Sequence, residues 1–125
     1  MMLLSVFVGG GLGALLRHFS IAFFKTQLPG AFPYGTLFVN ILGSLLIGII
    51  MEGAARKWNI SAQAQAFMVT GVLGGFTTFS SFSFDVFKLA NTGETLLAAG
   101  YVALSVFLSL LAVFGGVYLM RGALQ

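Results

Sequence analysis

The chain has 125 residues, of which 58% are hydrophobic and only 7% charged. Soluble domains carry charge on roughly 25% of their residues, so this chain has too little charge to cover a water-facing surface. Its net charge of +3 is scattered, unlike the clustered basic face of a nucleic-acid binder, and without cysteine it has no disulfide, thiolate nucleophile or cysteine zinc site.

Four apolar stretches follow one another along the chain. A helix needs about 20 apolar residues to cross a hydrocarbon core about 30 Å thick, so four crossings use nearly the whole length. Two prolines within Leu28–Pro33 are expected to end the first helix, and Ser61 to cap the third. Thr92 or Thr95 is expected to cap the fourth. We predict an all-α membrane protein with a single transmembrane domain over residues 1–125 and helices at about 2–24, 35–51, 61–88 and 94–120.

The basic residues divide almost evenly between the two sides of the membrane. One side receives three and the other two or three: Arg56, Lys57 and Arg121 against Lys25, Lys88 and, less clearly, Arg17. Because an excess of lysine and arginine normally sets the orientation, this tally specifies none. The chain is then expected to insert both ways up; the alternative is that such low counts carry no signal.

Small residues recur at a spacing of four, which lets two helices approach closely. The pairs are Gly9 with Gly13, Gly10 with Ala14, Ser44 with Gly48, and Gly71 with Gly75. Such pairs pack helices either within one chain or between two chains. Because four helices of this length cannot enclose a pore by themselves, we expect an oligomer.

The third helix contains a run that weakens it. Gly74 and Gly75 are poor helix formers, and four hydroxyls compete for backbone hydrogen bonds: Thr77, Thr78, Ser80 and Ser81. We therefore expect a break near residues 74–80. Carbonyls freed at membrane depth are tolerated where they line a cavity or bind an ion. The alternative is an unbroken helix whose small residues pack against a neighbour.

Phenylalanines recur every three residues through this run, at Phe76, Phe79 and Phe82, and would share one face of the segment. Aromatic rings have positive edges, so edges turned inward can stabilise a small anion without a full positive charge. Weak binding of that kind permits conduction. Aromatic stripes in membrane helices also commonly face lipid or pack the core, and both interpretations stay open.

Two further polar features lie inside apolar helices. Asn40 sits in the middle of the second helix, where an amide must be satisfied, either as interhelical glue or as an ion contact. Tyr101, Ser105 and Ser109 recur every four residues of the fourth helix and form a polar stripe. That stripe either conducts an ion or bonds to a neighbouring helix.

The charged residues predict little chemistry. Arg17 lies within snorkelling reach of the interface, as an electropositive lure for anions or as an anchor. Glu52 is expected to pair with Arg56, and Asp85 with Lys88. No nucleophile–base pair, phosphate loop or metal cluster is evident, so we expect no enzyme.

Three ordered motifs resemble the Fluc/CrcB family of fluoride channels along the whole chain. They are the stretches Gly10–Arg17, Gly35–Asn40 followed by Gly43 and Ser44, and Gly74–Phe82. The resemblance implies an antiparallel, dual-topology homodimer. This dimer would lie in the bacterial plasma membrane (the inner membrane) and contact its lipids. Two pores would let fluoride leave the cytoplasm passively, which lowers its concentration there and confers fluoride resistance.

The resemblance also assigns roles to residues. Phe79 and Phe82 would be the pore phenylalanines, and Asn40 a fluoride-contacting amide. The polar track would consist of Tyr101, Ser105 and Ser109. The backbone carbonyls of Gly74 and Thr77 from both subunits would hold a structural sodium ion, with Gly75, Thr78, Ser80 and Ser81 completing the helix break. Arg17 would sit near the vestibule. Ser81 departs from the family's usual threonine but keeps a hydroxyl.

Two rival functions belong to other classes. A proton-coupled small multidrug exporter has a similar length and four helices, but it needs a carboxylate in the membrane interior, and the first helix here has none. A non-transporting packing subunit is the other rival. It predicts that changes at Asn40 and at the phenylalanines affect assembly alone.

Overall fold

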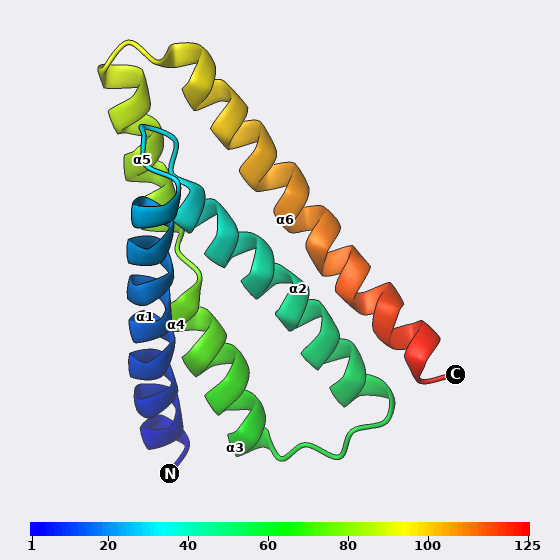
Figure 1. Cartoon of the computed structure of the whole chain (residues 1–125). Helices are drawn as coiled ribbons and strands as arrows, with labels where there is room; N and C mark the ends of the chain where they lie inside the picture. Colours follow the sequence, from blue (N-terminus) through cyan, green and yellow to red (C-terminus); the bar gives the residue numbers. More distant parts are fainter.

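The computed structural model describes residues 1–125, which form helices and connecting turns with no strand (Figure 1). The element order is α1 (Met2–Gln27), α2 (Tyr34–Arg56), α3 (Ala62–Gln65), a π-helical segment η1 (Ala66–Leu73), α4 (Gly74–Phe76), α5 (Phe79–Asn91) and α6 (Thr95–Ala123). Elements α3 to α5 together make one interrupted span. The molecule therefore has four helical segments long and apolar enough to cross a membrane.

The spans are longer than the sequence predicted. They cover Met2–Gln27, Tyr34–Arg56, Ala62–Asn91 and Thr95–Ala123. Each helix was predicted to end at or before its terminal charged residues, but α1, α2, α5 and α6 all carry a basic residue in the last turn. A cation there interacts favourably with the negative end of the helix dipole, so the helices continue past the charge.

Two pairs of spans pack closely. Helix α1 lies beside the interrupted third span, and α2 lies beside α6 (Figure 1). At the first seam, a Cβ added to Gly9 would stand 2.6 Å from the carbonyl oxygen of Phe67, and one added to Gly71 would stand 2.9 Å from the Cα of Gly9. At the second seam, a Cβ on Gly48 would stand 2.5 Å from the Val113 carbonyl oxygen. These small residues therefore bring backbones together within one chain.

Of the two predicted helix caps, one is confirmed and one is wrong. The Ser61 side chain accepts a hydrogen bond from the backbone N–H of Ala64 at 3.1 Å, which confirms it as the cap of the third span. The prediction of a threonine cap for α6 was wrong, because its N-cap is Glu94, without a side-chain bond. The Thr92 hydroxyl instead donates to the Lys88 carbonyl at the end of α5, since the turn leaves that carbonyl within reach.

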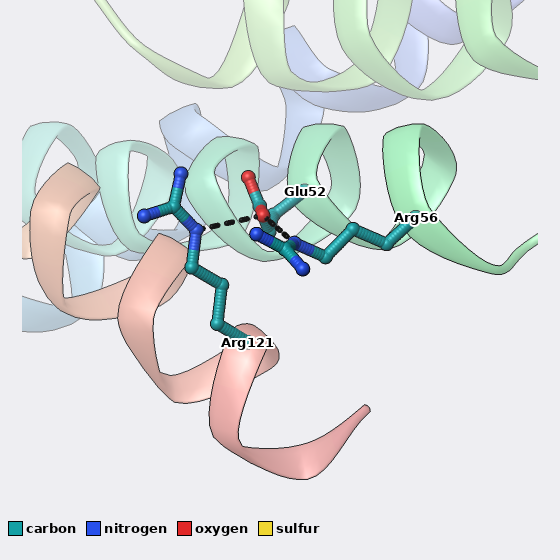
Figure 2. Close-up of polar contacts among 3 residues, drawn as sticks. All are labelled: Glu52, Arg56 and Arg121. Carbon is teal, nitrogen blue, oxygen red and sulfur yellow. Dashed lines mark hydrogen bonds and ion pairs between the residues drawn. The ribbon is translucent and has the colours of Figure 1, made fainter. Parts of the chain in front are cut away.

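An ion cluster joins the ends of α2 and α6 (Figure 2). The predicted pairing of Glu52 with Arg56 is confirmed, and Arg121 contacts the same carboxylate at 2.9 Å. The contact of Arg121 with Glu52 was not predicted, because the two residues lie far apart in the sequence and meet only through the packing of α2 on α6.

Candidate functional site

The third span is interrupted at two residues. Thr77 and Thr78 are extended, with φ and ψ of −85° and 158° and of −153° and 119°. The Thr78 hydroxyl accepts from the backbone N–H of Ser81 at 3.1 Å and so caps α5. The expected break near residues 74–80 is thus present but shorter, because the glycines before it and the serines after it keep helical geometry.

Asn40 on α2 bridges this interruption. Its Nδ2 donates to the carbonyl oxygen of Thr78 at 3.0 Å, and its Oδ1 accepts from the N–H of Thr78 at 2.8 Å. Both backbone groups of an extended, buried residue are thereby satisfied by one amide, as burial away from water requires. Asn40 is therefore interhelical glue, and the second N–H of its Nδ2 stays available to another acceptor.

The carbonyls of Gly74 and Thr77 lose the donors that a continuous helix would give them. In such a helix the Gly74 oxygen would accept from the N–H of Thr78, but that N–H donates to Asn40. The Thr77 oxygen would accept from the N–H of Ser81, but that N–H donates to the Thr78 hydroxyl. No side chain donates to either oxygen, and neither is an acceptor in the backbone hydrogen bonds outside the helices. Gly74 is exposed and Thr77 half-buried, so these dipoles are open to a ligand or a second chain.

Arg17, on α1, bonds to the chain just before the interruption. Its Nε donates to the carbonyl oxygen of Gly75 at 2.9 Å, and the side chain is half-buried. A third oxygen near the interruption is thus satisfied by a guanidinium from α1. The arginine braces the end of α4 and does not line the cavity described below.

The prediction that the three phenylalanines share one face was wrong. Phe76 precedes the extended residues and is buried. Phe79 and Phe82 follow them, with ring centroids 5.6 Å apart, and they differ in exposure: 78% for Phe79 against 8% for Phe82. The two extended residues break the three-residue spacing, which leaves only Phe79 and Phe82 as a pair.

A cavity of about 460 Å³ lies between α2, the third span and α6. Five of the six residues predicted for the pore line it: Asn40, Phe79, Phe82, Ser105 and Ser109. Its wall also includes Gly74, Thr77 and Thr78 of the interruption. The hydroxyl oxygens of Ser105 and Ser109 are buried and have no hydrogen-bond partner in the chain. Buried hydroxyls are normally paired, so these two are available to a ligand.

Tyr101, the sixth predicted residue, does not line the cavity but packs against Phe82, which does. It is fully buried, its ring centroid lies 5.2 Å from that of Phe82, and its hydroxyl donates to Oδ2 of Asp85 at 3.1 Å. The expected Asp85–Lys88 pair is wrong, because the carboxylate turns toward α6 while Lys88 lies over the Phe84 ring at 5.7 Å. A signal for Asp85 was present: it follows Phe82 by three residues and so lies on the same side of α5.

Comparison with known proteins matches this arrangement to a family. Residues 4–117 match the model of the CrcB-like protein, Camphor Resistance (CrcB) family. A fluoride-specific ion channel FluC of Rhizobium meliloti (strain 1021) is 46% identical over 119 residues, 95% of each chain. A protein of the same name from Rhodopseudomonas palustris (strain BisB5) is 47% identical over 118 residues, 94% of this chain and 95% of the relative.

These matches agree with the structure on the class of protein. The family is a class of membrane transport proteins and not of enzymes, and the four spans make this chain a multi-pass protein of the bacterial inner membrane. Because the family model and both relatives cover almost the whole chain, the chain belongs to the Fluc/CrcB family of fluoride ion channels.

Proposed function

We propose that this chain forms a passive, fluoride-selective channel that lets fluoride leave the cytoplasm down its gradient. The observation that carries the proposal is the cavity, whose lining includes two serines with unpartnered hydroxyls and a pair of phenylalanines. The relatives named fluoride-specific ion channels support the choice of ion. The wall of the cavity holds no carboxylate, lysine or histidine that could act as a general base or carry a coupled proton.

Each polar group in the cavity can replace part of the water around a small anion. The hydroxyls of Ser105 and Ser109 can donate to fluoride, as can the second N–H of Asn40. The positive edges of the Phe79 and Phe82 rings add attraction without a fixed charge. Binding that is favourable but weak lets the ion enter and leave, as conduction requires.

The conducting unit in this proposal is an antiparallel, dual-topology homodimer. Phe79 is 78% exposed although it lines the cavity, so one chain supplies only part of a wall. The near-equal division of basic residues between the two sides supports insertion in both orientations. A tag on the C-terminus is then expected on both faces of the membrane, and detection on a single face would refute dual topology.

The same proposal includes a structural sodium ion at the dimer centre. The carbonyls of Gly74 and Thr77 fit it, because both are hard oxygen donors whose helical N–H partners are bonded elsewhere, and both lie at the interruption. The ion would neutralise the negative ends of these dipoles and hold the two third spans together. Arg17 does not compete for it, since its Nε is committed to Gly75.

The phenylalanine pair tests the proposal. Phe79→Ile and Phe82→Ile replace the polarised ring edges with aliphatic groups, and fluoride efflux from liposomes is expected to fall to the protein-free level. Phe84→Ile is the matched control, since this exposed ring of α5 stacks on Phe87 and does not line the cavity. Efflux that survives both pore substitutions, or that falls equally with Phe84→Ile, would refute it.

A further inference from the structure

The ion cluster of Glu52, Arg56 and Arg121 leaves most of its hydrogen-bonding capacity unused. Oε1 of Glu52 accepts from the Nε atoms of both arginines, at 2.9 Å for Arg121 (Figure 2). In the hydrogen bonds of the chain, these Nε atoms are the only guanidinium nitrogens of the pair that are engaged. The terminal amino groups of both arginines remain free, and a guanidinium fork matches phosphate geometry.

The cluster lies where lipid headgroups would be. Arg56 is the last residue of α2, and Arg121 is two residues from the end of α6, so both stand at the ends of membrane spans. Their side chains are 49% and 42% exposed. Basic sites between transmembrane helices at this depth bind anionic lipid headgroups.

The charge of the cluster favours a lipid with a net negative charge. Two guanidiniums and one carboxylate leave one positive charge, and Lys57, the next residue after Arg56, adds another. An anionic phospholipid neutralises this excess. A zwitterionic lipid brings its own cation, and the carboxylate oxygen nearest the arginines already accepts from both of them.

An apolar stripe on α6 leads away from Arg121 toward the membrane interior. Tyr118, Phe114, Leu111 and Phe107 follow at steps of three and four residues, and each is more than half exposed. The Arg121 guanidinium sits 5.2 Å from the Tyr118 ring centroid, and that ring stacks on Phe114. At about 100° per residue this stripe lies on the opposite side of α6 from Ser105 and Ser109, which face the cavity.

From these observations we propose that the cluster and the stripe form a binding site for an anionic phospholipid. The lipid phosphate sits between the free amino groups of Arg56 and Arg121, and an acyl chain runs along the stripe from Tyr118 to Phe107. Glu52 orients both guanidiniums by holding their Nε atoms. The site is independent of the cavity and of fluoride conduction.

Trp58, the only tryptophan in the chain, reports on this site, because it lies two residues after Arg56 and is partly exposed. The test measures its fluorescence in phosphatidylcholine vesicles that contain brominated phosphatidylglycerol or, in parallel, brominated phosphatidylcholine. Bromine quenches the indole on contact. We expect the anionic lipid to quench at least about fivefold more effectively, from the free energy of about 1 kcal/mol that one basic residue contributes at a membrane surface.

Three comparisons decide the proposal. The double substitution Arg56→Gln with Arg121→Gln is expected to abolish the preference, whereas the charge-matched control Lys25→Gln with Lys88→Gln, at the other end of the spans, leaves it unchanged. Arg121→Lys keeps the charge but loses the fork and is expected to lower the preference measurably. Inorganic phosphate at constant ionic strength should not relieve the quenching.

Any of four results would overturn it: no preference in the unmodified protein, equal losses in the two double variants, full preference in Arg121→Lys, or displacement by inorganic phosphate. The measurement on the unmodified protein and the measurement on Arg121→Lys remove no charge. They therefore test the proposal even if the double glutamine variant fails to fold.

Discussion

The third span has two halves that differ in composition and in what they contact: the first is rich in glycine and aliphatic residues, the second in phenylalanine and serine. In the first half, η1 and α4 lie against α1 with glycine facing glycine, and a Cβ on Gly71 would stand 2.9 Å from the Cα of Gly9. In the second half, α5 leaves Phe79 exposed and borders a cavity with the unpaired hydroxyls of Ser105 and Ser109.

This difference between the halves indicates that the first contributes mainly to folding stability and the second to ion conduction. Close backbone contact in the first half gains dispersion energy from atoms that touch on all sides. Beside the second half, the buried and unpaired hydroxyls of Ser105 and Ser109 on α6 cost free energy. A protein keeps such groups where they bind something else. Substitutions in the first half should therefore change folding, and substitutions around the cavity should change ion flux.

The largest effect is expected at Asn40, which joins the two halves. Asn40→Leu leaves the N–H and the carbonyl of Thr78 buried without partners, and we expect a loss of about 2 kcal/mol or more in the free energy of unfolding, because each such group costs about 1–3 kcal/mol. Chemical unfolding in detergent measures it.

Asn40→Asp is the companion variant. The carboxylate still accepts from the N–H of Thr78 but cannot donate to its carbonyl and repels an anion, so a smaller loss of stability should accompany loss of fluoride flux. Normal flux in this variant would remove Asn40 from the pore and favour a purely packing role.

The next effect is expected at the glycine seam. Gly9→Ala places a Cβ only 2.6 Å from the Phe67 carbonyl oxygen, which is closer than van der Waals contact, so the helices must move apart. Overpacking of this kind costs about 1–3 kcal/mol. Gly11→Ala, on the same helix with nothing within 4 Å, is the control and should be neutral or slightly stabilising, since alanine favours helix. Equal thermal stability of the two variants would contradict the close contact.

The smallest effect on stability is expected at the serines. Replacing Ser105 and Ser109 with alanine removes two unsatisfied hydroxyls, so stability should stay level or rise, while fluoride efflux should fall at least about tenfold through loss of two donors of about 1 kcal/mol each. Ser83→Ala is the control, because that exposed hydroxyl is bonded to the Phe79 carbonyl. A stability loss without a flux loss would make the serines structural.

The sequence predicted the broad features for identifiable physical reasons. Apolar length predicted four helices, and Gly74 with the hydroxyls after it predicted an interruption. The spacing of four in α6 predicted that Ser105 and Ser109 would face one side. These signals are local, so they survive without knowledge of the fold.

Contacts between distant segments were not predictable in the same way. The bonds from Asn40 to Thr78, from Arg17 to Gly75 and from Arg121 to Glu52 each join different spans. The sequence shows that each polar group needs a partner, but helix packing decides which one. The helix ends were also placed too early, because terminal basic residues favour a helix C-terminus and do not stop it.

The most direct test of the account is ion efflux from liposomes that contain only this protein, loaded with potassium fluoride or potassium chloride, with valinomycin carrying the balancing charge. The account predicts rapid fluoride release and chloride release no faster than from protein-free liposomes. Fluoride retained in the liposomes, or fluoride and chloride released at the same rate, would contradict it.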